Sequence, residues 1–118
     1  MLYVYNMSTG SKRKSDKQEQ VFKALADYKR REILDLLKNE PRTTGDLCNH
    51  FRSLDRCTVM QHLRVLESAD LVIVKRRGRQ RWNYINPLPI KDIYDRWISR
   101  YAIGAVDLLA RMKREMEG

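Results

Sequence analysis

Five cationic side chains lie within a short stretch of the sequence that contains no carboxylate. They are Lys75, Arg76, Arg77, Arg79 and Arg81, all between Val72 and Ile85. A guanidinium group can bind a phosphate through two parallel hydrogen bonds, and each phosphate that a protein neutralises releases counterions from a nucleic acid. The stretch therefore predicts contact with a polyanion. The alternative is that the charges only protect the edge of a strand from aggregation.

A second set of polar side chains falls on one face of a predicted helix that follows Asp55 and runs to about Ser68. With about 100° between successive residues, one face of this helix is apolar and points inward. The opposite face carries Gln61 and Arg64, whose planar amide and guanidinium groups can pair with base edges in a DNA major groove. Cys57 and Ser68 share that face, and Thr58, Met60 and Val65 flank it. An ordinary solvated helix face is the alternative interpretation.

Cys48 and His50 form a Cys-x-His pair of possible soft metal ligands. Zinc usually takes four protein ligands in a structural site, and the only other histidine, His62, belongs to the helix just described. We therefore expect no metal and no cofactor, with Cys48 as a small packing residue. The alternative is a metal or redox sensor that uses Cys48, His50 or Cys57.

The hydrophobic pattern predicts four short helices before the basic stretch. The first covers about 18–26, and the second is capped by Asp27 and ends before Pro41. The third follows Thr43 or Thr44, and the fourth is capped by Asp55. Third and fourth helices joined by so tight a turn form a helix-turn-helix pattern. Two strand-like segments around Gly78 then predict a β-hairpin, so the order is that of a winged helix-turn-helix, an α+β fold that is mainly α.

A long amphipathic helix is predicted from about Ile90 to Met116. Its apolar stripe is too long for a small domain to cover alone, which predicts dimerisation through a second copy of the chain. The residues expected at that interface are Ile93, Trp97, Tyr101, Gly104, Leu108 and Met112.

The chain has 118 residues and a net charge of +9. Its organisation is predicted as a mobile basic arm over 1–18, a DNA-binding domain over 19–88 and a dimerisation helix over 89–118. No apolar run is long enough for a membrane span, so we expect a cytoplasmic, nucleoid-associated protein without a membrane partner. No phosphate-binding loop, nucleophile elbow or paired carboxylates are recognisable, so neither an enzyme nor a small-molecule substrate is indicated.

The order of these segments resembles the ArsR family of winged-helix repressors. The matching segments are 22–27, 31–37, 58–66, 69–72 and 77–79, and the segment 93–98 is similar to a branch with a long C-terminal helix and no known metal site. The resemblance implies a homodimer that binds a near-palindromic operator and blocks transcription, with the helix after Asp55 in the major groove. Carried over by position, its recognition residues are Arg56, Cys57, Thr58, Met60, Gln61 and His62. Met60 departs from the family, in which many members have a serine.

The sequence thus predicts a sequence-specific regulator of transcription that binds double-stranded DNA. The hairpin would lie on the DNA backbone or in the minor groove. A non-specific nucleoid-binding protein, or a protein-interaction module in which the long helix matters most, is the remaining alternative.

Overall fold

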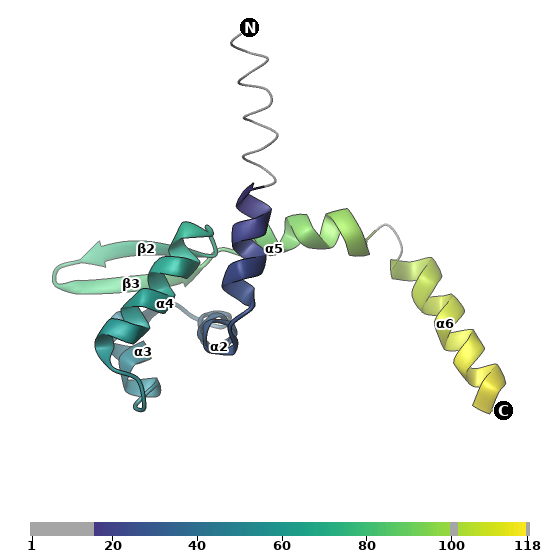
Figure 1. Cartoon of the computed structure of the whole chain (residues 1–118), viewed down its shortest axis with the longest axis horizontal. Coiled ribbons are helices and arrows are strands. Elements are labelled where there is room, and N and C mark those ends of the chain that lie inside the picture. Colours follow the sequence, from purple (N-terminus) through teal and green to yellow (C-terminus); the bar gives the residue numbers. More distant parts are fainter. Residues whose placement is uncertain (1–15, 100–101, 118) are drawn as a thin grey trace, which may run out of the picture.

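The computed structural model describes residues 16–99 and 102–117 of the chain. A helix over 16–25 precedes α2 (Tyr28–Leu37), α3 (Thr44–His50) and α4 (Arg56–Ser68), and α5 (Leu88–Ile93) and α6 (Ala102–Glu117) follow the sheet. Strands β1 (Arg42–Thr43), β2 (Val72–Arg77) and β3 (Gln80–Ile85) form an antiparallel sheet in the order β1-β3-β2. Figure 1 shows the first helix, α2, α3 and α4 gathered near the β2–β3 hairpin, with α6 apart from them. The predicted winged helix-turn-helix is confirmed.

Side chains cap the starts of three helices, because the first N–H groups of a helix have no partner inside it. Asp27 caps α2 by accepting a hydrogen bond of 2.8 Å from the backbone N–H two residues later. Thr43, and not Thr44, caps α3, and Asp55 caps α4 with a bond of 2.7 Å to the Thr58 N–H. The first helix is already formed at residue 16, ahead of the predicted start at Gln18.

The apolar face of α4 forms the centre of the core. Val59, Leu63 and Leu66 are completely buried, as the helical spacing predicts. They pack with residues from the 16–25 helix, α2, α3 and β2, which are Val21, Ala24, Ile33, Leu34, Leu37, Leu47, Phe51, Ala69, Leu71 and Val72. The position of α4 is therefore fixed by the first helix, α2, α3 and β2.

The end of α4 is closed by two backbone hydrogen bonds. The Leu71 N–H donates to the Leu66 carbonyl at 2.9 Å, and the Asp70 N–H donates to the Glu67 carbonyl at 2.9 Å. Asp70 has a φ of 61°, the left-handed conformation that this helix ending requires. Leu66 and Leu71 are both fully buried, which supplies the apolar contact typical of the motif. The chain therefore leaves α4 in a fixed direction and enters β2 at once.

Strand β1 has only two residues, and the sequence does not predict it. It pairs with β3 beside Asn83, a fully buried polar residue. The Asn83 amide nitrogen donates to the Arg42 carbonyl at 3.2 Å and to the Thr44 hydroxyl at 3.1 Å. Asn83 thus connects the base of the hairpin to the start of α3.

The prediction of one uninterrupted α-helix after the hairpin is wrong. After α5, residues Tyr94–Ile98 form a π-helical turn in which the Ser99 N–H donates to the Tyr94 carbonyl at 2.9 Å. Such a turn places one additional residue in the helix and changes the direction of the side chains that follow. Within it, Arg96 donates to Gln18 at 2.6 Å and Trp97 lies 5.7 Å from the Phe22 ring, so contacts with the first helix accompany the wider turn.

Candidate DNA interface

The polar face of α4 has the composition that the sequence predicts. Cys57, Gln61 and Arg64 are exposed, on the side of the helix opposite the buried leucines and Val59. The hydrogen bond from the Thr58 backbone N–H lowers the pKa of the Asp55 carboxyl group, so the cap is ionised at neutral pH. An amide, a guanidinium and a thiol are therefore presented in one row on a helix whose start is fixed.

Other predicted recognition residues lie beside this row or away from it. Arg56 is exposed at the first position of α4, whereas Thr58 and Met60 are half-buried and Met60 packs against the core. The half-buried His62 lies beside α2, where its Nδ1 is 3.3 Å from Nη1 of Arg30. The structure thus presents Cys57, Gln61 and Arg64 on one face of α4 and places the half-buried His62 against Arg30 of α2.

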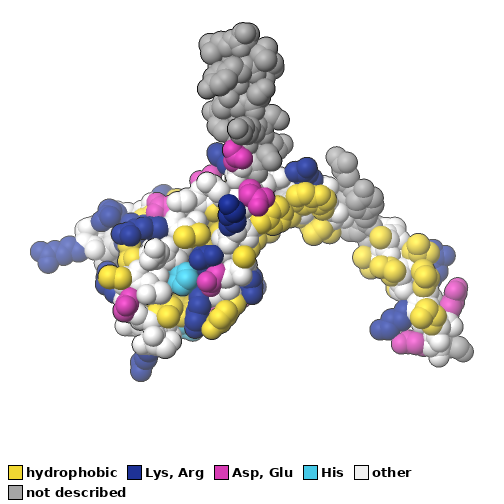
Figure 2. Space-filling view, viewed as in Figure 1, with side chains coloured by type: hydrophobic (Ala, Val, Ile, Leu, Met, Phe, Trp, Pro, Cys, Tyr) yellow, Lys and Arg dark blue, Asp and Glu magenta, His cyan; other side chains and the backbone are white. Residues whose placement is uncertain are grey.

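The hairpin presents four of its five predicted cations to solvent. Lys75, Arg76, Arg77 and Arg79 are exposed, and within residues 16–99 and 102–117 none of them has a carboxylate partner. Gly78 forms the turn with a φ of 62°, a conformation that side chains larger than hydrogen disfavour. Figure 2 shows basic side chains projecting from the hairpin end of the molecule.

The fifth cation, Arg81, has no acidic residue near it within 72–85, but its charge is paired with that of Glu67 on α4. Its Nη2 lies 2.9 Å from Oε1 of Glu67, and only 17% of its side chain is exposed. In the sheet Arg81 lies directly opposite Arg76, a like-charge pairing that destabilises a hairpin and that Glu67 relieves. The sequence expectation of five uncompensated charges is therefore corrected to four, and the sequence pattern did not indicate the ion pair between Glu67 and Arg81.

Cys48 and His50 have different neighbours and do not form a metal site together. Cys48 is half-buried and packs against the core, as expected, while His50 Nε2 lies 2.9 Å from Glu32 and its ring meets the edge of Phe51. Within the described part of the chain, no group of three or more histidine, cysteine or acidic residues is placed to hold a metal ion.

The residues predicted at a dimer interface differ in their surroundings. Ile93 is half-buried against the core, and Trp97 is 44% exposed while it contacts Phe22. Leu108 and Met112 are exposed on α6, whereas Tyr101 lies outside the described residues. Figure 2 shows apolar side chains along both α5 and α6. Of the helices described, none has the length and apolar character needed to cross a membrane.

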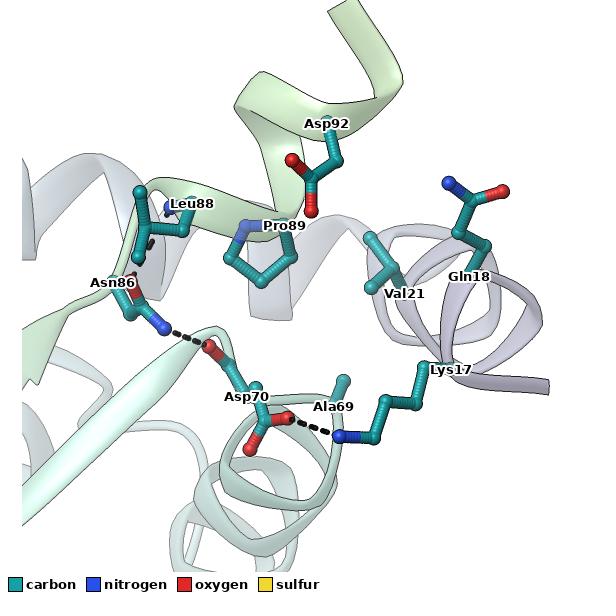
Figure 3. Close-up of a pocket in the computed structure, with 9 residues that line it drawn as sticks. All are labelled: Lys17, Gln18, Val21, Ala69, Asp70, Asn86, Leu88, Pro89 and Asp92. Atoms are coloured by element: carbon teal, nitrogen blue, oxygen red, sulfur yellow. Dashed lines mark hydrogen bonds and ion pairs between the residues drawn. The ribbon is translucent and has the colours of Figure 1, made fainter. Parts of the chain in front are cut away.

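A cleft of about 260 Å³ lies between the first helix, the end of α4 and α5 (Figure 3). On one side, the Lys17 ammonium lies 3.7 Å from the Asp70 carboxylate, and on the other the Asn86 amide donates to the Asp70 carbonyl at 2.8 Å. Because both contacts converge on Asp70, the first helix and the start of the C-terminal segment are tied to the end of α4.

Comparisons with known proteins agree with this architecture. Residues 25–75 match a family model described as a helix-turn-helix domain. The transcriptional repressor SdpR of Bacillus subtilis is 36% identical over 72 residues, which cover 61% of this chain and 79% of the repressor. The arsenical resistance operon repressor of Staphylococcus aureus is 33% identical over 73 residues, covering 62% of this chain and 69% of that protein.

A solved structure shows the same fold along most of the chain. An ArsR-like transcriptional regulator from Rhodococcus sp. RHA1 superimposes with a TM-score of 0.64 at 24% identity, covering 86% of this chain and 93% of that one. Together with the α4 row and the basic hairpin, these relationships establish a DNA-binding regulator of transcription. The chain belongs to the ArsR family of winged helix-turn-helix transcriptional regulators.

Proposed function

We propose that the chain is a sequence-specific repressor that binds a near-palindromic operator as a homodimer in the cytoplasm. In this proposal α4 enters the major groove and the β2–β3 hairpin lies on the backbone or in the minor groove. The observation that carries it is the exposed row of Cys57, Gln61 and Arg64 beside a hairpin with four uncompensated cations. The row can distinguish base pairs, whereas the cations bind phosphates of any sequence.

The exposed apolar stripe of α6 supports the homodimer. Val106 is 61% exposed, Leu109 63% and Met116 82%, and Leu108 and Met112 are also exposed on the same helix. Such a row of apolar side chains is costly in water and is typical of a helix that packs against a second chain. A Cβ atom added to Gly104 would meet no atom within 4 Å, so the described part of the chain does not itself require glycine there. A glycine at this position would allow the backbone of a second helix to approach closely.

DNase footprinting of the region upstream of the protein's own gene tests the sequence-specific proposal. We expect protection of two half-sites whose centres are separated by one helical turn of DNA, or by a multiple of it. Sedimentation of the free protein should give the mass of a dimer. Uniform protection of unrelated DNA would contradict sequence-specific binding and would favour a non-specific nucleoid-binding role.

Two substitutions separate the roles of the helix and the hairpin. Gln61→Ala should relax base preference at one position of each half-site, at a cost of about 1–3 kcal/mol for the preferred base. Arg79→Ala should weaken binding to every sequence and reduce the slope of log K against log salt by about one unit. A changed base preference with an unchanged salt slope in Arg79→Ala would show that this division of roles is wrong.

A further inference from the structure

A small concavity lies where the β1–α3 junction, the start of α4 and the turn of the hairpin meet. Its volume is about 180 Å³, below the roughly 300–1,000 Å³ of pockets that hold drug-sized organic ligands. Three arginines line it, Arg56, Arg79 and Arg81, together with Thr43, Thr44, Gly45 and Gln80. No carboxylate contributes to the lining. The concavity is thus compact, cationic and rich in hydrogen-bond donors.

The arginines of this concavity differ in how they are held. Arg81 is fixed in the wall by its contact of 2.9 Å with Glu67. Arg56 and Arg79 are exposed, and neither has an ion-pair partner among the residues that the structure describes. They come from α4 and from the hairpin turn, so a ligand that both bind would connect the recognition helix to the hairpin.

The threonine hydroxyls add donors to the same wall. Thr43 Oγ1 accepts from the Asp46 backbone N–H at 3.1 Å, and Thr44 Oγ1 accepts from the Asn83 amide at 3.1 Å. Since a hydroxyl that accepts still has its own O–H to donate, both lining threonines keep a hydrogen-bond donor. Guanidinium forks with hydroxyl donors are the groups that bind tetrahedral oxyanions.

We infer that this concavity is a binding site for a single phosphate, and that its occupant is one backbone phosphate of the DNA. This inference rests on the proposed function. It assigns Arg56 to the DNA backbone, although its place on α4 suggests a base contact, and it makes Arg56 and Arg79 two arms of one clamp. A clamp on one phosphate fixes the depth at which α4 enters the groove.

The salt dependence of binding tests whether the two arginines share a phosphate. Binding of the full chain to a labelled duplex of arbitrary sequence is measured by fluorescence anisotropy between 50 and 200 mM salt. Arg56→Gln and Arg79→Gln should each lower the salt slope by about one, so that the loss of affinity across this range becomes about 3.5-fold smaller. The double variant should also lower the slope by about one. A fall of two units in the double variant would overturn the shared site.

Phosphate-specific probes locate the contact on the DNA. The footprinted operator fixes the register of the protein on the DNA, so operator duplexes are prepared with a single neutral methylphosphonate at successive positions. The wild-type protein should bind more weakly when the methylphosphonate is at one position of each half-site, and Arg56→Gln and Arg79→Gln should be insensitive to it there. Sensitivity of the two variants at different positions would refute the clamp. The variant Arg114→Gln on α6 removes the same charge far from the concavity and should keep the wild-type pattern.

Two further measurements test the shape of the concavity and the identity of the anion that it binds. Gly45→Ala leaves the charge unchanged, and its new Cβ would have one neighbour, Thr43 Oγ1 at 3.8 Å, so the variant should fold normally. It should bind unmodified DNA more weakly and lose sensitivity to the methylphosphonate at the same position. Titration with inorganic phosphate at constant ionic strength distinguishes DNA phosphate from a free anion. Tight phosphate binding, with wild-type salt slopes in both arginine variants, would overturn the assignment to DNA. Because the salt measurements use arbitrary DNA, a missing operator would refute the proposed function and leave the phosphate site standing.

Discussion

Replacement of Arg30 by alanine should destabilise the domain by about 3 kcal/mol, because this side chain joins three helices. Its Nε donates to the Ala24 carbonyl at 2.8 Å and its Nη2 donates to the Lys23 carbonyl at 3.1 Å, both at the end of the first helix. Nη1 lies 3.9 Å from Asp27, the cap of α2, and 3.3 Å from His62 of α4. Only 17% of the side chain is exposed.

The magnitude follows from these contacts. A hydrogen bond to a charged group contributes about 1.5–3 kcal/mol, and we take a value near the lower end for each carbonyl contact because the Lys23 contact is exposed. The pair with Asp27 is long and adds at most about 0.5 kcal/mol. Arg30→Lys keeps the charge but offers one ammonium group to two carbonyls, so it should lose about half as much as Arg30→Ala.

Urea unfolding followed by circular dichroism measures this difference. Arg52→Ala is the matched control, because Arg52 is exposed in the turn before α4 and its loss should change stability by less than about 0.5 kcal/mol. If Arg30→Ala were as stable as Arg52→Ala, the junction would not hold the helices together. Equal losses in Arg30→Ala and Arg30→Lys would contradict the expected half loss, because they would show that the retained charge contributes nothing to stability.

Three further predictions concern the caps, the sheet and the last helix. Burial is the largest single influence on Asp27 and raises its pKa, but the backbone N–H groups at the start of α2 and the nearby Arg30 together lower the pKa below its usual value. The N–H of Thr58 lowers the pKa of Asp55. Both ionised carboxylates therefore stabilise the fold above about pH 4. The urea midpoint should fall as the pH decreases below 3.8, the ordinary pKa of an aspartate. A midpoint that stays constant from pH 6 to pH 2 would contradict this. Asn83→Ala should cost about 1–3 kcal/mol in urea unfolding, because it leaves buried polar groups without a donor, and no loss would show that water replaces the amide. Leu109→Lys should dissociate the proposed dimer in sedimentation without lowering helix content, and an unchanged mass would exclude α6 from the interface.

The features that the sequence predicted well are local. Asp27 and Asp55 cap their helices because a cap depends on a hydrogen bond to an N–H within three residues. The buried row of Val59, Leu63 and Leu66 follows from helical spacing alone. The turn at Gly78 follows from the conformational freedom of glycine.

The features that the sequence did not predict depend on distant partners. Glu67 and Arg81 are separated by a helix end and a strand, so their ion pair appears only when the hairpin folds back on α4. The contact of His62 with Arg30 requires α2 and α4 to pack, and it removes His62 from the surface row. Strand β1 has too few residues for a periodic signal, and the π-helical turn is accompanied by contacts with the first helix that spacing within the segment does not encode.

The ending of α4 at Asp70 has a consequence for the thermodynamics of recognition. Two backbone hydrogen bonds and the buried pair Leu66 and Leu71 leave the helix and the hairpin little freedom to move independently. A preorganised reading surface loses little conformational entropy when it binds, so more of the contact energy is available as affinity. A rigid surface also cannot adapt to a duplex of unsuitable shape. The deformation must then come from the DNA, and sequences that bend easily gain an advantage at base pairs that no side chain touches.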